Sequence, residues 1–249
     1  MIDVILHGAN GRMGKALQEM IAADPHLQVV AGIDKWVDES AAFPQYSVPQ
    51  DCQTKADVII DFSNHSAVPA LLDYCVASKT PVIVATTALT EDCKSQITEA
   101  AKEIPVFFSA NMSLGINVLM KALKAITPVL EESFNVEIIE KHHNQKSDSP
   151  SGTALLLADT INDACQVKKN YLFGRHGKED ECKLTDLGIH AVRGGTIPGE
   201  HTVLYAGSDE LIELKHTALS RAIFAGGAVK AAKFLANKAP GLYTMEDLV

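Results

Sequence analysis

The sequence predicts an α/β protein in which a parallel sheet, covered by helices, is interrupted by an inserted α+β domain. Three observations lead to this prediction. Short Val- and Ile-rich runs alternate with helical patterns up to about residue 112 of the 249-residue chain. Strand-like runs separated by Gly and Asp turns then follow one another. A last helical segment, 220–238, is expected to return to the first domain, which gives the expected domains 1–112 plus 222–249 and 113–221.

In the first half of the chain, each element follows from its apolar spacing and its turn residues. Helices are predicted at 13–23, at 66–77 and at 90–103, where Thr90 is the candidate N-cap. Because strands and helices alternate, the sheet is expected to be parallel and covered on both faces. The predicted strands are 4–8, 27–34, 56–63, 80–87 and 105–113.

The second half predicts helices at 115–131 and 151–164, with a strand between them at 135–144. Three more strands are predicted to follow one another closely. Tight turns between consecutive strands favour largely antiparallel pairing in this domain. The three later strands are 185–195, 199–209 and 210–218.

Composition excludes several classes of function. The net charge is −9 and no long Lys or Arg run occurs, which disfavours a nucleic-acid partner. The five cysteines are scattered without a C-x-x-C pair, so neither a disulfide framework nor a zinc site is indicated. No run approaches the roughly 18 apolar residues of a membrane span, and no signal-peptide pattern is found. We therefore expect a cytoplasmic protein with no membrane partner.

The segment "GANGRMG", 8–14, lies between the first predicted strand and the first predicted helix. In a dinucleotide-binding loop, Gly8 would permit the tight turn and Gly11 would let the backbone approach a pyrophosphate. Gly14 would let the helix pack close to the strand, and the helix N-terminus would face the anion. An ordinary tight turn is the alternative interpretation. The context favours a Rossmann-like domain that binds NADH or NADPH.

Polar groups follow the later strands at the edge where such sheets bind ligands. Asp34 ends the second strand twenty residues after Gly14, where a carboxylate would accept hydrogen bonds from the adenosine ribose. Lys35 follows directly, and a cation there would tolerate a 2′-phosphate, so the choice between NADH and NADPH stays open. The strand ends 85–87 and 109–113 contribute further candidates, among them Thr86, Thr87 and Asn111.

The segment "EKHHNQKSDSPSGTAL", 140–155, brings two imidazoles and an ammonium close to a helix start. Histidine suits proton transfer, and Lys146 can donate a proton or pair with a carboxylate. Neighbouring strand residues point to opposite faces, so it stays open whether His142 or His143 faces a ligand. A metal site is the weaker alternative, because no Cys, Asp or Glu stands at ligand spacing. Two surface histidines are the other alternative.

The helix start after Pro150 predicts an anion site. The N–H groups at Gly152 and Thr153, at the start of this helix, would bind a carboxylate or phosphate. Asp148 and Ser149 are the candidate caps.

Together, the segments "GANGRMG" and "EKHHNQKSDSPSGTAL" resemble the dihydrodipicolinate reductase family of bacterial lysine and diaminopimelate biosynthesis. The segments "RGGTIPGEHTVLYAG", 193–207, and "LKHTALSRAIFAGGAVKAAKFL", 214–235, continue the similarity in the same order. The resemblance implies an enzyme that uses NADH or NADPH to reduce a cyclic imine dicarboxylate to tetrahydrodipicolinate. It also implies a homotetramer built through the sheet of the inserted domain, which would bind substrate.

The resemblance implies roles for individual residues. His142 would donate or accept the proton and Lys146 would be the second acid, while His143 would contact substrate. Gly152 and Thr153 would hold a substrate carboxylate, and no metal is implied. The implied cofactor-binding residues are Gly8, Ala9, Asn10, Gly11, Arg12, Met13, Asp34, Ala85, Thr86, Thr87, Ser109, Ala110, Asn111 and Met112.

Two departures from the family pattern lie beside the expected cofactor. Ala85 and Ala88 stand where the family often has glycine, and Met112 stands where it often has phenylalanine. A different nicotinamide enzyme, such as an amino-acid dehydrogenase, would keep the glycine loop but has no reason to keep the His-His-Lys segment. A non-catalytic NAD-sensing protein would need a docking or DNA-binding segment, which this acidic chain does not offer.

Overall fold

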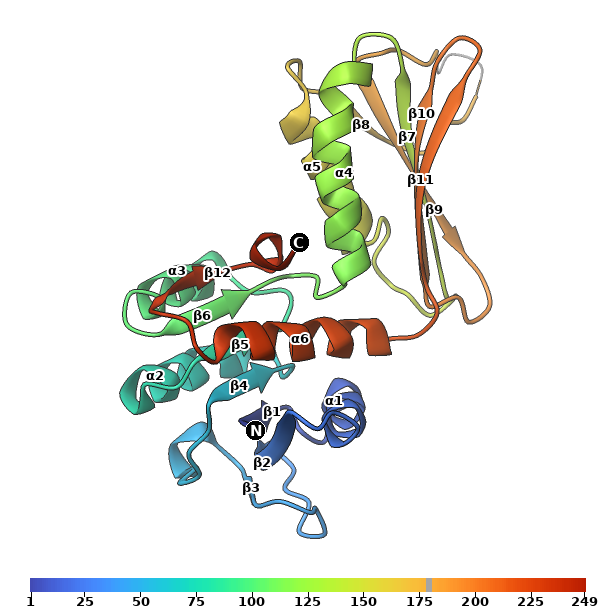
Figure 1. Ribbon diagram of the computed structural model, residues 1–249. Coiled ribbons are helices and arrows are strands. Elements are labelled where there is room, and N and C mark those ends of the chain that lie inside the picture. The colour runs from blue at the N-terminus through green and yellow to red at the C-terminus, as the bar shows by residue number, and fades with distance from the viewer. Residues whose placement is uncertain (178–180) are drawn as a thin grey trace. The chain divides into compact units, whose positions relative to one another are not determined.

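The computed structural model describes residues 1–177 and 181–249, which form two compact units (Figure 1). Unit 1 contains Met1–Leu114 and Arg221–Val249, and unit 2 contains Gly115–Ser220. Within the described ranges, no helix combines the length and apolar character that crossing a membrane requires.

Unit 1 is built on a seven-stranded sheet in the order β12-β6-β5-β4-β1-β2-β3. Every pairing in it is parallel, as the alternation of strands and helices predicted. The edge strands β3 and β12 are new, because runs of two and three residues carry no periodic pattern. The strands are β1 Ile2–His7, β2 Leu27–Ile33, β3 Gln45–Tyr46, β4 Val58–Asp61, β5 Val82–Val84, β6 Pro105–Phe108 and β12 Gly241–Tyr243.

Helices cover both faces of this sheet, because successive strand residues point to opposite sides. Leu6 packs in a core with α1 and α6, whereas Ile5 packs in a second core with α2 and α3. Thr90 caps α3 as predicted, its hydroxyl accepting the Cys93 N–H at 3.2 Å. The helices are α1 Arg12–Ala22, α2 Val68–Ser78, α3 Glu91–Ala100 and α6 Ala222–Leu235, with short 3₁₀ turns η1 Pro49–Asp51, η2 His65–Ala67 and η3 Met245–Leu248.

Unit 2 contains a five-stranded sheet in the order β11-β10-β7-β9-β8. The expectation of largely antiparallel pairing was wrong for half of it. β10 is antiparallel to β7 and β11, but β9 is parallel to β7 and β8. The chain returns from β7 to β9 through a helix, and such a crossover makes neighbours parallel. The strands are β7 Asn135–His142, β8 Asn170–Phe173, β9 Asp186–Arg193, β10 Gly199–Ala206 and β11 Leu211–Ala218.

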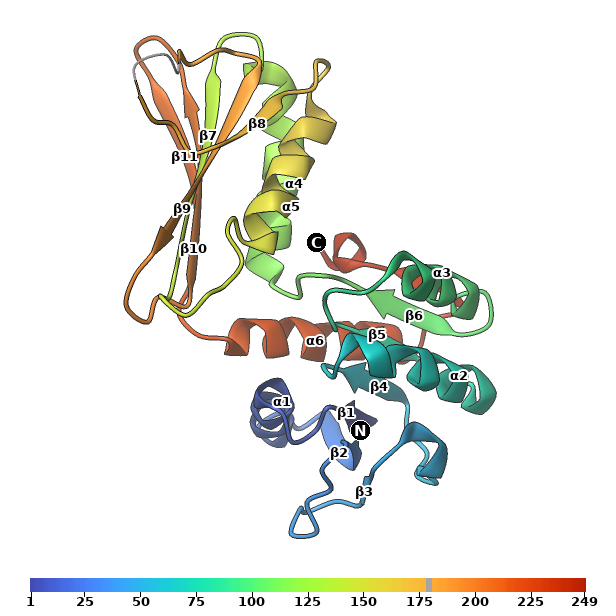
Figure 2. The same cartoon turned by 180° about the vertical axis from the view of Figure 1, so that it is seen from behind.

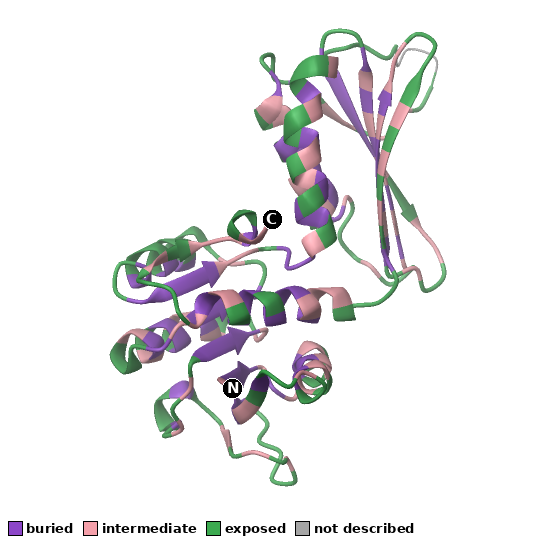
Figure 3. Ribbon diagram, in the orientation of Figure 1, coloured by how far each residue is buried: buried purple, intermediate pink, exposed green. Residues whose placement is uncertain are grey.

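One face of the unit 2 sheet is covered by α4, Leu114–Leu130, and α5, Gly152–Ala164, which lie side by side in both views (Figures 1 and 2). Their apolar faces meet the buried residues of β7 and β10 in a third core. Burial alternates strictly along β7, so every second residue from Val136 to His142 is buried (Figure 3). The position of His142 on this face follows directly from the period-two pattern.

Candidate active site

The glycine loop of unit 1 needs glycine at two of its three glycine positions. Gly8 has a φ of +82°, and a Cβ there would lie 2.6 Å from the Phe62 carbonyl oxygen. A Cβ on Gly14 would lie 2.3 Å from the carbonyl oxygens of Gly8 and Ala9. Gly11 is the N-cap of α1 and offers no side-chain acceptor, and the first turn contains no acid. The N-terminus of α1 therefore keeps its positive dipole end for an anion.

A cavity of about 430 Å³ lies beside this loop in unit 1. Seven predicted cofactor-binding residues line it: Arg12, Met13, Ala85, Thr86, Thr87, Ala110 and Met112. The Thr86 hydroxyl oxygen is buried and has no hydrogen-bond partner among the described residues. A buried hydroxyl without a partner is costly, so this atom fits a ligand that brings a polar group into the cavity.

Four further residues line the cavity that sequence reasoning missed: Phe62, Ser63, Arg221 and Phe224. Phe62 and Ser63 directly follow β4, so the rule about strand ends would have found them. Arg221 and Phe224 come from the start of α6, far along the chain, and no local pattern marks them.

The other predicted cofactor residues hold the loops in place. Asp34 accepts the Asn10 N–H at 2.9 Å and the Trp36 N–H at 3.1 Å, which ties the glycine loop to the end of β2. The Ser109 hydroxyl donates to the Asn111 carbonyl and accepts the Asn111 N–H in the turn after β6, and neither residue lines the cavity. The predicted set therefore divides into residues that line the cavity and residues that shape it.

In unit 2, His142 lies in a network of buried polar groups on the helix-covered face of the sheet. Its Nδ1 lies 2.6 Å from Glu140 Oε2, and the Glu140 side chain is completely buried. Arg193 of β9 donates to both oxygens of Glu140, each at 2.7 Å. Since an ionised carboxylate only accepts, Nδ1 must carry the proton and Nε2 is the free position.

The side of His142 that carries Nε2 is kept open by Gly199. A Cβ at that position would lie 3.1 Å from Nε2, closer than nearly all contacts that real Cβ atoms make. His201 packs edge-on against His142, with 5.1 Å between ring centroids. Ser151 Oγ lies 3.0 Å from His201 Nε2 and accepts the Ala154 N–H at 3.1 Å.

These surroundings shift the pKa values of the three buried groups. Burial lowers the pKa of His142, although the hydrogen bond and charge of Glu140 oppose this. Burial alone would raise the pKa of Glu140, but bonds from Arg193, His142 and the Ser151 N–H hold it below its ordinary value. Burial lowers the pKa of His201 to about 4, so this ring is neutral near pH 7.

The helix start after Pro150 differs from the prediction. The N-cap of α5 is Ser151, so the expectation of Asp148 or Ser149 was wrong. Pro150 precedes the cap instead of opening the helix, and the Ser151 hydroxyl reaches the Ala154 N–H. The helix begins at Gly152, one residue later than predicted, and a Cβ there would meet nothing within 4 Å.

Lys146 and His143 lie in the turn that follows β7. The Lys146 ammonium pairs with Asp148 Oδ1 at 2.8 Å, and its backbone N–H bonds to the His143 carbonyl. Burial raises the pKa of Asp148, but the bonds from Lys146 and the Gly152 N–H leave it below its ordinary value. His143 is half-buried, one residue past the end of β7. Of the two adjacent imidazoles, His142 is therefore the one in the buried network.

The opposite face of β7 holds a separate ion-pair cluster. Glu137 accepts from Arg175 at 2.7 Å and contacts His190 Nε2 at 2.6 Å. A Cβ on Gly188 would lie within 2 Å of the Glu137 carboxylate, so glycine is needed on the adjacent strand. In the described part of the chain, no cluster of three His, Cys, Asp or Glu residues has metal-binding geometry.

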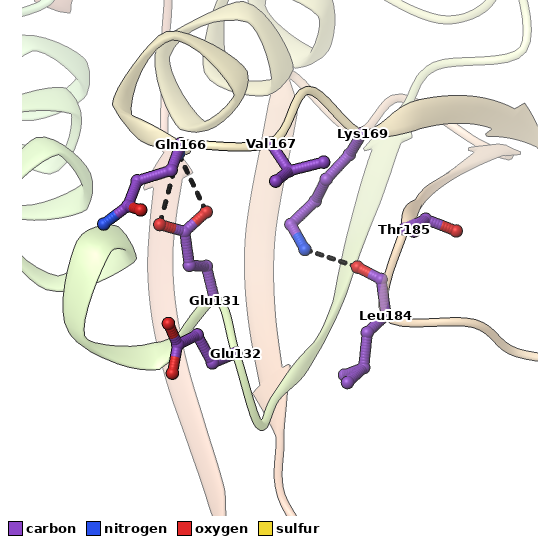
Figure 4. A pocket seen from close by; sticks show the side chains of 7 residues that line it. All are labelled: Glu131, Glu132, Gln166, Val167, Lys169, Leu184 and Thr185. Carbon is purple, nitrogen blue, oxygen red and sulfur yellow. Dashed lines mark hydrogen bonds between the residues drawn. The ribbon is translucent and has the colours of Figure 1, made fainter.

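A second cavity, about 280 Å³, lies in unit 2 and is lined by none of the predicted site residues (Figure 4). The Glu131 carboxylate there accepts the Gln166 N–H at 3.0 and 3.2 Å, and the Lys169 ammonium donates to the Leu184 carbonyl (Figure 4). Both charged groups thus stabilise the loop that follows α5. The predicted chemistry lies instead in the His142 network and beside the glycine loop.

Comparison with known proteins finds relatives that match this chain over its whole length. The sequence profile described as dihydrodipicolinate reductase, N-terminus, matches residues 2–112, and the profile of its C-terminus matches residues 115–249. The 4-hydroxy-tetrahydrodipicolinate reductase of Caldanaerobacter subterraneus subsp. tengcongensis is 52% identical over 249 residues, covering 100% of this chain and 98% of the relative. The enzyme of the same name from Clostridium novyi is 48% identical with the same coverage.

Solved structures show the same fold. A dipicolinate-bound dihydrodipicolinate reductase from Paenisporosarcina sp. TG-14 superposes with a TM-score of 0.84 at 23% identity, covering 100% of both chains. A probable dehydrogenase from Thermotoga maritima superposes with a TM-score of 0.66 at 14% identity, covering 99% of this chain and 92% of the other. At these identities the likeness concerns the fold alone.

Proposed function

Because this chain belongs to the dihydrodipicolinate reductase family, we propose that it reduces 4-hydroxy-tetrahydrodipicolinate, or its dehydrated ring, and that His142 transfers the proton. The chain is an oxidoreductase of lysine and diaminopimelate biosynthesis that uses NADH or NADPH. Unit 1 is the proposed dinucleotide-binding domain and unit 2 the proposed substrate-binding domain. The cytoplasm is the proposed location.

The observation that carries the proposed mechanism is the hydrogen bond from His142 Nδ1 to Glu140. It leaves Nε2 as the atom that can hold or release a proton, next to the space kept by Gly199. The nicotinamide, when bound, supplies the hydride. The hydroxylated ring would first lose its hydroxyl group as water. Reduction of the dehydrated ring then requires one proton, which His142 Nε2 would provide and solvent would replace.

One helix start and one cation suit the substrate's two carboxylates. The N–H groups at Gly152 and Thr153 lie in the first turn of α5, where the helix dipole favours an anion. The Lys146 ammonium would exchange its exposed partner Asp148 for a substrate carboxylate or act as the second acid. His143 is the proposed further contact to substrate.

The residues of unit 1 fit a nicotinamide dinucleotide. The open start of α1, from Gly8 to Met13, suits the pyrophosphate, and Asp34 lies beside it for the ribose. The buried Thr86 hydroxyl, which has no hydrogen-bond partner in the described part of the chain, suits the polar end of the nicotinamide. Ala85, Thr87 and the turn 109–112 complete the proposed cofactor site.

The proposed assembly is a homotetramer formed through the sheet face of unit 2 that α4 and α5 leave uncovered. This face is partly apolar, and Val192 and Leu211 on it are 46% and 54% exposed. Exposed apolar side chains on a sheet face that no helix covers can be buried by contact with another chain. Sedimentation at a mass of four chains would support this proposal, and a monomer at micromolar concentration would refute it.

The function is tested by following NADH and NADPH oxidation at 340 nm with and without freshly formed substrate. We expect oxidation only when substrate is present, and its absence with both cofactors would refute the proposal. His142→Gln should lower kcat about 100-fold or more and leave the Kd for NADH unchanged, since proton transfer contributes about 10²–10⁴-fold. His26→Gln, an exposed substitution in unit 1, is the matched control and should keep full activity. An equal loss of turnover and cofactor binding in His142→Gln would argue for a structural role.

A further inference from the structure

Glu140 is a carboxylate that follows two apolar residues on the helix-covered face of β7. Val136 and Ile138 precede it on the same face, and all three are completely buried. Burial of a charge is costly unless it is paired and hydrogen-bonded. A well-packed apolar residue would stabilise this core at least as well, so the carboxylate needs another explanation.

The hydrogen bonds of Glu140 reach two proposed functional groups. Oε2 accepts from His142 Nδ1 at 2.6 Å, and Oε1 accepts the Ser151 N–H at 2.9 Å. Ser151 is the N-cap of α5, so a single carboxylate touches both the proposed acid and the start of the proposed anion-binding helix.

Arg193 completes this arrangement from β9. It donates to both Glu140 oxygens, a bidentate geometry that favours the ionised carboxylate. Its Nη2 also donates to the Asp148 carbonyl at 2.8 Å, and Asp148 holds the Lys146 ammonium. The turn that carries Lys146 is therefore fixed to the same ion pair.

We propose that Glu140 is a positioning residue for the reaction: it holds His142 as the Nδ1–H tautomer with Nε2 available, and it fixes the start of α5 relative to that ring. This inference rests on the proposed role of His142. A carboxylate that orients an imidazole in this way acts through the ring and does not touch substrate. Arg193 keeps the carboxylate charged and in place.

The charge on Glu140 also affects the proton affinity of His142. Four charged or titratable groups surround the ring from β7, β9, β10 and the following turn: Glu140, Arg193, His201 and Lys146. Of these, only Glu140 favours the protonated ring, since the two cations oppose it and His201 is neutral near pH 7. Removal of the Glu140 charge should therefore lower the pKa of His142 further.

The first experiment compares Glu140→Gln, His142→Gln and the double variant. We expect Glu140→Gln to lower kcat about 10–100-fold with an unchanged Kd for NADH, as is typical when a group that orients a functional side chain is lost. In the His142→Gln background the same change should have almost no further effect on kcat, because its target is gone. An equal loss in both backgrounds would overturn the proposal.

The pH dependence separates positioning from simple stabilisation. If protonated His142 is needed, Glu140→Gln should move the alkaline fall of kcat to lower pH by about one unit, and Arg193→Gln should move it to higher pH. Arg193→Gln also serves if Glu140→Gln does not fold. A lowered unfolding temperature with an unchanged pH profile in both variants would overturn the proposal.

Glu137→Gln is the matched control, because Glu137 lies on the same strand and also pairs with an arginine and a histidine. It faces the other side of the sheet, so kcat and the pH profile should stay unchanged at equal oligomeric state. An effect as large as that of Glu140→Gln would show that any buried ion pair of β7 supports turnover, against the proposal.

Nitrogen-15 NMR of the histidine rings tests the inference independently of activity. The signal that disappears in His142→Gln should show the Nδ1–H tautomer in the wild type and should lose it in Glu140→Gln. Observation of the Nε2–H tautomer in the wild type would overturn the inference. Full activity of His142→Gln with the expected tautomer would instead refute the proposed function and leave the hydrogen-bond assignment standing.

Discussion

Gly226 and Gly227 are neighbours on α6 that differ sharply in the space around them. A Cβ on Gly226 would meet only the flexible end of Met20, at 3.8 Å. A Cβ on Gly227 would lie 1.7 Å from the Met112 carbonyl oxygen and 2.8 Å from its carbon. Real Cβ atoms keep at least 3.0 Å, so the two atoms must separate by 1.3 Å, the difference between 3.0 and 1.7 Å.

The same substitution, glycine to alanine, should therefore have opposite effects at the two positions. In a helix interior the change alone stabilises by about 0.5–1 kcal/mol, and Gly226→Ala should show this gain. Overpacking costs about 1–3 kcal/mol or more, and here the obstacle is backbone, so Gly227→Ala should lose about 2 kcal/mol net. At about 2–4 °C per kcal/mol for a chain of this size, the unfolding midpoints should rise by about 1–4 °C and fall by about 4–8 °C respectively.

The activity of the two variants tests the same geometry at the cofactor cavity. Met112 lines that cavity, so a shift of its carbonyl by more than 1 Å should raise the KM for NADH about 10–100-fold in Gly227→Ala. Gly226→Ala should keep the wild-type KM. Circular-dichroism melting and NADH titration measure both effects. If Gly227→Ala melts and binds NADH like Gly226→Ala, the close approach of α6 to Met112 is refuted.

Three further predictions follow from burial, composition and capping. Below pH 6.5, His201 binds a proton in the unfolded chain but not in the folded protein. The unfolding free energy should therefore fall by about 3 kcal/mol between pH 6.5 and the folded pKa of His201, about 4. Denaturant titrations should show a smaller fall in His201→Asn, and an equal fall would contradict this prediction. Trp36 is the single tryptophan of the chain, is 75% exposed and donates its backbone N–H to Asp34. NADH should therefore quench the tryptophan fluorescence on binding. Unchanged emission at saturating NADH would place the adenosine elsewhere. Ser151→Ala removes the α5 cap and should lower the unfolding free energy by about 1 kcal/mol in urea, whereas no change would show that the cap bond contributes nothing.

The elements of unit 1 could be predicted because buried parallel strands are short, continuous apolar runs between segments with helical spacing. The strand pairing in unit 2 could not be predicted. The sequence shows which strands are joined by tight turns, but it does not show beside which strand the chain returns after a helix. The sequence of β7 contains a further signal. Glu140 stands two residues before His142, at a position that Val136 and Ile138 mark as buried, and a charge there is a signal.

The partners of Glu140 and His142 were beyond the reach of local reasoning. Arg193 and His201 come from β9 and β10, about fifty residues further on, and only the sheet register brings them to β7. The same holds for Arg221 beside the glycine loop, which α6 contributes from the far end of the chain. Spacing along the sequence reveals residues on one element, whereas contacts between elements require the fold.

The two faces of β7 have a consequence for changes in chain length. Glu137 and Glu140 are three residues apart and therefore lie on opposite faces, each with its own arginine and histidine. Deletion of a single residue between Glu137 and His142 would break this pattern, because it would either turn His142 toward the uncovered face or bury Glu137 beneath the helices without Arg175. Insertions and deletions inside this strand should therefore abolish activity, whereas those in the turn that follows it should be tolerated.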